Sequence, residues 1–260
     1  TRTHHRVCHL CEAMCGLVIQ TEGGKVTDIR GDKDDPLSRG HVCPKALALQ
    51  DIHEDPDRLR KPMKRIRSAP GEYQHVEIEW SEALDLAAGA LASTIEKQGV
   101  DAIGAYFGNP SVHNYGMLTH QRNLFRHIRT RNRFSATSVD QLPHHLVSLW
   151  CFGHMLLHPI PDVDRTHYFL MLGANPLASN GSIWTVPDVR QRLKDLKSRG
   201  GKLVVVDPRR TETAELASEH LFIRPGSDAA FLLAIIHVLF RDEMVAPGPL
   251  ADFTDGLDEV

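Results

Sequence analysis

Residues 202–210 read KLVVVDPRR, a run of apolar and mostly β-branched residues that turns polar at Asp207. An unbroken apolar run of this length is typical of a strand that is covered on both faces, as in parallel sheets. The proline that follows cannot continue a strand ladder, so the strand ends there. We therefore expect a buried parallel strand over 202–206 that brings Asp207 and Arg209 to the carboxyl edge of a sheet.

Comparable segments lie on both sides of this strand. The stretch 168–172 is apolar and ends in Gly-Ala-Asn-Pro, and a third strand is expected over 220–223. Helices are expected between Pro187 and Gly200 and over 229–241, because proline suits a helix start and glycine its end. Towards the N-terminus the alternation continues, with strands over 76–80 and 101–107 and helices over 81–99, capped by Ser81, and over 115–129. This pattern predicts an α/β fold with a doubly wound, mostly parallel sheet.

Three of the expected strand ends carry small, kinked, polar sequences that contain Asn109, Asn175 and Asp207. Ligands of open α/β sheets collect at the carboxyl ends of the strands, so these residues are candidates for binding a nucleotide. Each motif taken alone is equally typical of a plain turn. The chain has neither a G-x-G-x-x-G fingerprint nor a Walker lysine motif, which disfavours NAD and ATP.

Four cysteines near the N-terminus stand as C-x2-C-x3-C-x27-C, directly followed by Pro44: they are Cys8, Cys11, Cys15 and Cys43. This spacing favours an iron-sulfur cluster, because three thiolates in one loop can cover one face of a cubane while the fourth arrives from a distant turn. Structural zinc is the alternative, although zinc ribbons usually bring two separate C-x2-C pairs. The fifth cysteine, Cys151, has apolar neighbours and is expected to be a small buried side chain.

The cysteines belong to a small module with short strands. A hairpin is expected from 16–20 and 25–30, joined at Gly23-Gly24, followed by a loop over 32–39 and a helical turn over 45–51. The proline-containing and basic stretch 56–70 is expected to be a linker. We therefore predict two domains, an iron-sulfur module over residues 1–69 and a nucleotide-binding α/β domain over residues 70–260.

The composition is that of a globular protein with a sizeable core, with 260 residues, 42% of them hydrophobic, and a net charge of -3. A negative net charge gives no general attraction to nucleic acid or to anionic membranes. The longest apolar run, 229–240, is shorter than the roughly 20 residues that a membrane span needs, so no span is expected. The sequence opens at Thr1 without an apolar leader, so we expect a cytoplasmic protein, with a removed export signal as the alternative.

Four motifs in this order resemble those of the molybdopterin oxidoreductases of the dimethyl-sulfoxide reductase superfamily. They are the cysteine motif ending in Pro-Lys at 44–45, LGANP at 172–176, VVDPRRT at 205–211 and RPGSD at 224–228. The resemblance implies a 4Fe-4S cluster on the cysteines and a molybdenum or tungsten atom held by two molybdopterin guanine dinucleotides. It also implies a small-molecule substrate and a protein that donates or accepts electrons.

The resemblance assigns roles to further residues. Lys45 would lie between the cluster and a pterin, where its charge favours electron passage, and Asn109 would meet a pterin or a phosphate. Five residues would surround one guanosine and its phosphates: Asn175, Asp207, Arg209, Gly226 and Asp228.

The protein ligand of the metal is expected in the stretch 135–145, which contains no cysteine. The resemblance favours Asp140, with Ser138 second, while the alternative is that Asp140 only caps a helix that begins near Leu142. An aspartate here counts against formate as the substrate and favours oxygen transfer. Cys8, however, stands where oxygen-transferring members often have histidine, so the substrate stays open.

Histidines crowd the stretch after Asp140. His144 or His145 could bind an anionic substrate or shuttle protons, and an ordinary surface or core position is equally consistent with the sequence. His154 and His158 are spaced i, i+4, so both could meet a metal on one helix face.

Members of the resembled family are much longer than this chain, so we expect the N-terminal portion of an enzyme that needs its C-terminal portion for activity. The favoured function is a molybdenum- or tungsten-dependent oxidoreductase that relays electrons through the cluster. Two alternatives remain: a cluster-carrying or cofactor-binding module without turnover of its own, and a non-redox hydratase that uses the metal as a Lewis acid.

Overall fold

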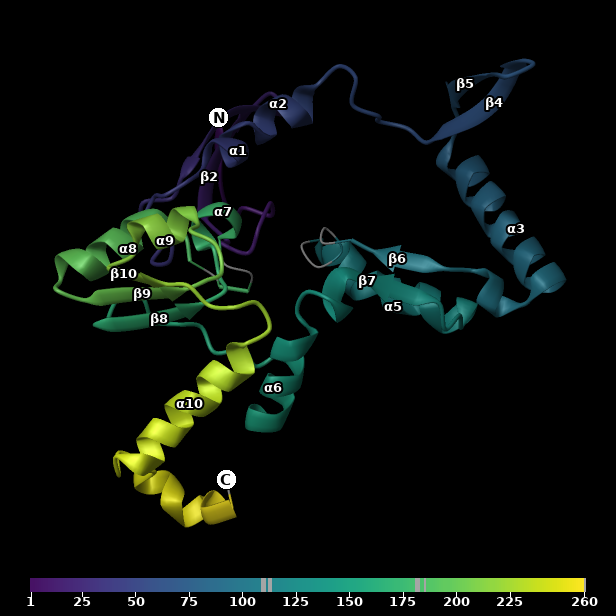
Figure 1. The fold of residues 1–260 in the computed structure, drawn as a ribbon. Helices are drawn as coiled ribbons and strands as arrows, with labels where there is room; N and C mark the ends of the chain where they lie inside the picture. The colour runs from purple at the N-terminus through teal and green to yellow at the C-terminus, as the bar shows by residue number, and fades with distance from the viewer. Residues whose placement is uncertain (109–110, 112–113, 181–182, 185, 260) are drawn as a thin grey trace. The chain divides into compact units, whose positions relative to one another are not determined.

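The computed structural model describes residues 1–108, 111, 114–180, 183–184 and 186–259 (Figure 1). The chain divides into two compact units. The first contains Thr1–Pro161 and Ser182–Val189, and the second contains Asp162–Gly181 and Arg190–Val260.

The first unit begins with a three-stranded antiparallel sheet in the order β1-β2-β3. The strands are β1 (Arg2–Val7), β2 (Gly16–Glu22) and β3 (Lys25–Gly31). The predicted hairpin is confirmed as β2 and β3, and Gly23 and Gly24 form its turn with positive φ angles of 58° and 84°. The sequence did not predict β1, because five of its six residues are exposed and it therefore has no apolar pattern.

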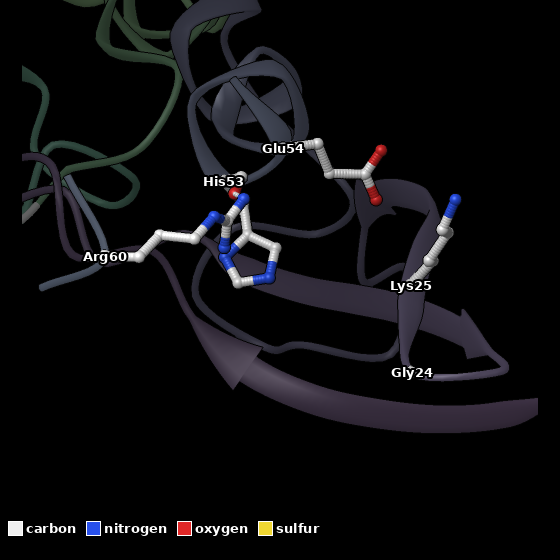
Figure 2. A pocket seen from close by; sticks show the side chains of 5 residues that line it. All are labelled: Gly24, Lys25, His53, Glu54 and Arg60. Atoms are coloured by element: carbon white, nitrogen blue, oxygen red, sulfur yellow. Dashed lines mark hydrogen bonds between the residues drawn. The ribbon is translucent and has the colours of Figure 1, made fainter. Parts of the chain in front are cut away.

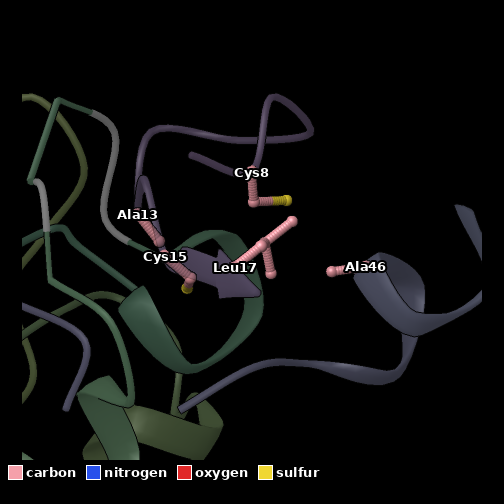
Figure 3. Close-up of a cluster of buried hydrophobic side chains, with 5 residues drawn as sticks. All are labelled: Cys8, Ala13, Cys15, Leu17 and Ala46. Atoms are coloured by element: carbon pink, nitrogen blue, oxygen red, sulfur yellow. The ribbon is translucent and has the colours of Figure 1, made fainter. Parts of the chain in front are cut away.

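Two short helices follow the loop over 32–39: α1 (Pro44–Leu47) and α2 (Leu49–Glu54). They correspond to the predicted helical turn over 45–51. A small core joins α1 to the sheet, with Leu17 and Ala46 only 2% and 1% exposed. Figure 3 shows these two side chains together with Cys8, Ala13 and Cys15. The core of this module is therefore built partly from its cysteines.

The prediction of a linker over 56–70 is wrong for its second half. A hairpin forms there from β4 (Met63–Ala69) and β5 (Glu72–Glu77). Most of its residues are exposed, so the basic side chains lie on a solvated strand, and the guanidinium of Arg65 lies 4.7 Å from the ring centroid of Tyr73. The predicted domain boundary after residue 69 falls in the turn of this hairpin. The division into 1–69 and 70–260 stays a prediction.

The long helix α3 (Trp80–Gln98) starts one residue earlier than predicted, so Ser81 is not its cap. Its N-cap is Glu79, which makes no side-chain cap bond, and Gly99 ends it with a φ of 87°. The expected strand over 101–107 is shortened to β6 (Ala105–Phe107), because η1 (Val100–Ala102) forms a 3-10 turn first. β6 pairs in parallel with β7 (Arg133–Ser135).

Two more helices complete the described part of the first unit, α5 (Tyr115–Ile128) and α6 (Leu142–Phe152), with the 3-10 turn η2 (Ala136–Ser138) between them. The Asn114 side chain caps α5 by accepting a hydrogen bond of 2.9 Å from the backbone N–H of Met117. The predicted helix over 115–129 is confirmed.

The second unit contains a parallel sheet in the order β10-β9-β8. Its strands are β8 (Tyr168–Leu172), β9 (Lys202–Val206) and β10 (Glu219–Leu221). Within β9 the residues from Leu203 to Val206 are all buried, with exposed fractions between 0% and 3%. The central strand is thus covered on both faces, as the run KLVVV predicts, and the mostly parallel α/β fold class is confirmed.

Helices connect these strands: α7 (Pro176–Ser179), α8 (Val189–Ser198), α9 (Glu212–Leu216) and, after β10, α10 (Asp228–Arg241). The side chains of Leu193 and Leu196 on α8 are fully buried, whereas α10 buries none of its residues. Two 3-10 turns close the chain, η3 (Gly248–Phe253) and η4 (Leu257–Glu259). None of the described helices is both long enough and apolar enough to cross a lipid bilayer.

Candidate functional site

The first three cysteines lie in the connection between β1 and β2. Cys8 directly follows β1, Cys15 directly precedes β2, and the backbone N–H of Cys8 donates a hydrogen bond of 2.8 Å to the carbonyl oxygen of Cys15. This bond closes the loop that carries Cys11. Cys43 is the N-cap of α1, where Pro44 fixes the first helical position. Two sequence-distant segments therefore deliver the four thiols.

The four thiols share one electrostatic environment. Burial, together with the nearby Cys8, Cys11 and Cys43, raises the pKa of the Cys15 thiol to about 11. Burial also raises the pKa of Cys8, whereas the ammonium group of Lys45 acts to lower it. Lys45 is exposed on α1 and its charge acts on Cys8, and its predicted place between the cluster and a pterin stays a prediction.

The four thiols are a suitable donor set for a 4Fe-4S cluster. Tetrahedral zinc with bonds of about 2.3 Å needs its sulfur atoms roughly 3.8 Å apart. Over the described residues, no three Cys, His, Asp or Glu side chains are gathered closely enough to hold one metal ion. Four thiolates around a cubane lie further apart, because each binds a different iron atom. Iron would also supply the positive charge that the buried thiols of Cys8 and Cys15 need to ionise.

A distant segment contacts both cysteine loops. The carboxylate of Glu12 accepts a hydrogen bond of 3.1 Å from the backbone N–H of Ile183, and His41 Nδ1 lies 3.5 Å from Asp188 Oδ2. Trp184, which is 7% exposed, donates from its ring N–H to the carbonyl oxygen of Pro161 at 3.2 Å. We call residues 183, 184 and 186–188 the strap.

The backbone of the strap is unusual. Ile183 has a φ of 66° and Asp188 a φ of 53°. A β-branched residue in this left-handed region costs about 1 to 3 kcal/mol, so the surrounding contacts must hold Ile183 in place. Glu12, which lies between two ligand cysteines, provides one of those contacts.

In the second unit, Asn175 lies just beyond β8 and is fixed by two neighbours. Its Nδ2 donates to Glu212 Oε2 at 2.8 Å, and its Oδ1 accepts from the hydroxyl of Thr213 at 2.7 Å. The Thr213 oxygen also accepts from the backbone N–H of Leu177 at 3.3 Å, and Thr213 is fully buried. α9 thus orients the predicted nucleotide-binding asparagine.

Asp207 lies at the end of β9 and is 7% exposed. Its Oδ1 accepts a hydrogen bond of 2.7 Å from the backbone N–H of Arg209, which tightens the turn and leaves the Arg209 side chain exposed. The Nε2 atom of His220 lies 3.1 Å from the Asp207 carbonyl oxygen, while its buried Nδ1 atom has no protein hydrogen-bond partner. The sheet therefore places Asn175, Asp207 and Arg209 at the carboxyl ends of adjacent strands.

The remaining predicted nucleotide residues are less constrained. Gly226, with a φ of 80°, and Asp228 are exposed at the start of α10, and their contribution stays a prediction. Asn109 lies outside the described residues. Sequence reasoning missed Glu212, Thr213 and His220, because their roles depend on contacts across the sheet edge. Only the helix-starting pattern Thr-Glu-Thr at 211–213 could have drawn attention to two of them.

The predicted metal ligand is exposed. Asp140 and Ser138 both lie on the surface of this chain, where a further group could reach them. The alternative role of Asp140 as a helix cap is wrong, because the N-cap of α6 is Gln141 and no side chain caps this helix. Whether Asp140 binds the metal stays a prediction.

The histidines after Asp140 form a cluster that the sequence did not predict. His144 is exposed, whereas His145 is buried and its Nδ1 lies 2.9 Å from the carbonyl oxygen of Met155. The ring of His158 packs edge-on against the ring of His145, with centroids 4.9 Å apart, and its Nδ1 lies 3.0 Å from the hydroxyl of Ser148. Burial lowers the pKa of His158, and positive charge on His145 and His144 lowers it further.

Two expectations for this region are wrong. His154 and His158 do not share a helix face, because α6 ends at Phe152 and Gly153 turns the chain with a φ of 75°. Cys151 is exposed instead of buried, because only His145 and Ser148 form the buried face of α6.

A separate hollow of about 360 Å³ lies in the cysteine module (Figure 2). It is lined by residues from the β2–β3 turn, from α2 and from the segment after α2: Gly24, Lys25, His53, Glu54 and Arg60. None of the four ligand cysteines lines it, so this hollow is distinct from the predicted cluster site.

Both parts of the chain match known protein families. A family described as molybdopterin oxidoreductase matches residues 58–259, and the Fe4S4 domain of molybdopterin oxidoreductases matches residues 1–54. This chain belongs to the molybdopterin oxidoreductase family. The two descriptions name the cofactors that the sequence predicts, a molybdopterin and a 4Fe-4S cluster, and confirm the resemblance.

Relatives of this molybdopterin oxidoreductase chain include proteins with different names. The probable oxidoreductase YoaE of Bacillus subtilis is 28% identical over 98% of the chain and 36% of its own length. The F420-dependent formate dehydrogenase 2 subunit alpha of Methanococcus maripaludis is 27% identical, also over 98% of the chain and 36% of its own length. The solved acetylene hydratase of Pelobacter acetylenicus superposes with a TM-score of 0.75 at 26% identity, over 98% of the chain and 34% of its own. The chain thus spans about a third of the length of these relatives.

Proposed function

We propose that this chain is the N-terminal part of a molybdenum- or tungsten-dependent oxidoreductase. The enzyme exchanges two electrons with a small substrate, and a 4Fe-4S cluster relays these electrons between the metal and a partner protein. The observation that carries the proposal is the cysteine set. Four thiols from two distant segments share one electrostatic environment, and the charge of Lys45 acts on Cys8 within it. The family match over both parts of the chain supports the same function.

Each group of residues has a role in this proposal. Cys8, Cys11, Cys15 and Cys43 hold the cluster, and the positive charge of Lys45 stabilises the additional electron on it. When bound, the pterin-held metal supplies two-electron chemistry and the cluster supplies single-electron steps.

The carboxyl edge of the second sheet is proposed to hold one guanosine. Asn175 offers both a donor and an acceptor to a base or ribose, Asp207 accepts from hydroxyl or amino groups, and Arg209 offers its guanidinium to phosphate oxygens. Gly226, Asp228 and Asn109 are proposed to complete the cofactor contacts. Asp140 is proposed as the protein ligand of the metal, and His144 and His145 as groups that bind the substrate or move its protons.

A longer enzyme is proposed because the chain spans about a third of the length of its relatives. The large apolar side chains that α10 leaves exposed, among them Leu233 at 63%, are consistent with contacts to such a further portion.

The test is an anaerobic analysis of metals and nucleotides in the purified protein. We expect about four irons per chain with acid-labile sulfide, together with molybdenum or tungsten and guanine nucleotide. Replacing Cys43→Ser should lower the iron content strongly, because a cubane loses one of its four ligands. The matched variant Cys151→Ser should keep its iron, because Cys151 is an exposed thiol outside the set. Iron without molybdenum, tungsten or nucleotide would instead support a cluster-carrying module, and zinc without iron would contradict the proposal.

A non-redox hydratase is the second candidate, because the likeness to acetylene hydratase extends over 98% of the chain. In that case the metal would activate water and the substrate would be neither oxidised nor reduced. Turnover by the complete enzyme with an artificial electron acceptor separates the two candidates. An oxidoreductase needs an electron acceptor or donor for turnover, whereas a hydratase forms its product without one.

A further inference from the structure

We propose that Asp35 and Ser38 are positioning residues that fix the two cysteine-bearing segments to each other. This inference rests on the proposed cluster function. Ser38 is only 3% exposed although it lies in the long loop between β3 and Cys43. A buried hydroxyl in a loop needs hydrogen-bond partners, and those partners identify its role.

Ser38 connects the loop to the residue that follows Cys15. Its hydroxyl oxygen accepts a hydrogen bond of 3.0 Å from the backbone N–H of Gly16. The same hydroxyl donates to Asp35 Oδ2 at 2.5 Å, and the backbone N–H of Ser38 donates to that oxygen at 2.6 Å. The carboxylate thus orients the hydroxyl so that its lone pair faces Gly16, and each bond strengthens the next.

Close packing at Gly16 supports this connection. A Cβ atom on Gly16 would lie 2.7 Å from the Cβ of Asp35, which real structures do not show. The carbonyl oxygen of Gly16 also accepts a hydrogen bond of 2.9 Å from the backbone N–H of Asp32. Both polar backbone groups of Gly16 are therefore used by the loop over 32–38.

The other end of the loop is fixed by a pair of glycines. A Cβ atom on Gly31 would lie 2.0 Å from the carbonyl oxygen of Gly40, so only glycine permits this approach. Gly40 has a φ of 84° and lies three residues before Cys43. The loop thus leaves β3, binds Gly16 beside Cys15, returns to Gly31 and then delivers Cys43. This path of the loop fixes the position of Cys43 relative to Cys15, although 27 residues separate the two in the sequence.

The same hydrogen bonds also occupy the backbone N–H of Gly16, the residue next to Cys15. Ser38 accepts from the Gly16 amide, and the Asp35 carboxylate also interacts with it. As long as both hold this amide, it is not available to a cysteine or cluster sulfur atom. Hydrogen bonds to these sulfur atoms help to set the reduction potential of a cluster. An amide released from Ser38 would stabilise the reduced, more negatively charged cluster and raise its potential.

The test compares variants of the loop after anaerobic loading with iron and sulfide. Ser38→Ala should lower the iron bound per chain at least twofold and shift the potential of the remaining cluster to a more positive value. Asp35→Asn keeps the shape but weakens the orientation of the hydroxyl, so we expect a smaller shift in the same direction. Asp34→Ala is the matched control, because Asp34 lies in the same loop and its side chain is exposed. Asp34→Ala should bind as much iron per chain as the unmodified protein, and its cluster should have the same potential.

Amide hydrogen exchange of the metal-free protein provides a measurement that does not require a cluster. The Gly16 amide should exchange at least tenfold faster in Ser38→Ala than in the unmodified protein or in Asp34→Ala. Unchanged iron content and potential in both Ser38→Ala and Asp35→Asn, or unchanged exchange at Gly16, would overturn the inference. If the unmodified protein binds no iron, the proposed cluster function fails, and the exchange rate alone then decides whether the loop is held as described.

Discussion

At the scale of single residues, the histidine cluster gives the clearest dependence on pH. His158 lies edge-on to His145 and against Ser148, and its burial lowers its pKa below the ordinary value of about 6.5. The folded protein therefore binds this proton less readily than the unfolded chain does. The contribution to stability is present above the unfolded pKa and falls as the pH drops from there towards the folded pKa.

We expect NMR titration of the ring protons to give His158 a protonation midpoint below 6.5. Chemical denaturation should then show a loss of stability as the pH is lowered from 7 to 5, and replacing His158→Asn should reduce this loss. A midpoint at or above 6.5 would contradict the burial seen in the structure.

Thr213 gives a second prediction at this scale. Its hydroxyl orients Asn175, so replacing Thr213→Val keeps the shape of a fully buried side chain while removing the bond of 2.7 Å. The loss of such a bond costs about 1 kcal/mol, so guanine nucleotide should bind roughly fivefold more weakly. Equilibrium binding of guanosine diphosphate measures the effect. Thr254→Val is the control, because the exposed Thr254 bonds only the Leu250 carbonyl oxygen. Equal affinities for the two variants would argue against a role of Asn175 in binding.

At the scale of secondary structure, the strand β9 dominates the second sheet. Leu203 is fully buried, whereas Leu221 on the neighbouring strand β10 is 41% exposed. Replacing Leu203→Ala should lower the free energy of unfolding by about 2 to 5 kcal/mol, because it leaves a cavity in the core. Leu221→Ala should cost less than about 1 kcal/mol, since its side chain is already partly solvated. Urea denaturation of both variants checks the prediction, and similar losses would mean that β9 is not the core of this sheet.

The same contrast explains which elements could be predicted from the sequence. β8 and β9 are apolar runs that end in polar turns, so their bounds agree with the prediction, whereas the cysteine ligand set stays a prediction. β1 and β4 present mostly polar side chains to solvent, so their pairing depends on backbone hydrogen bonds that leave no apolar pattern. The start of α3 was misplaced because Ser81 resembles a cap, but Trp80 already has helical geometry. The contacts of Glu212, Thr213 and Ile183 join residues far apart in the chain, which periodicity does not detect.

At the scale of the whole molecule, a hydrogen bond joins Glu12 in the first cysteine loop to Ile183 in the strap, 171 residues further along the chain. Replacing Glu12→Ala removes the acceptor for the Ile183 amide, so hydrogen exchange at Ile183 and in the loop of Cys11 should become faster. Glu12→Gln retains an acceptor oxygen and should restore most of the protection. Glu22→Ala, an exposed residue at the end of β2, is the control. Equal protection in Glu12→Ala and the control would show that the strap holds without this contact.

The strap also has a consequence for the order in which a newly made chain matures. All four cysteines precede Ile183 by at least 140 residues, so they are synthesised well before it. At about 5 to 20 residues per second, synthesis separates Glu12 from Ile183 by roughly ten to thirty seconds. During that interval the cysteine loops exist without their distant contact. The hydrogen bond between Glu12 and Ile183 can form only after this interval, so the loop of Cys11 gains its distant contact late in synthesis.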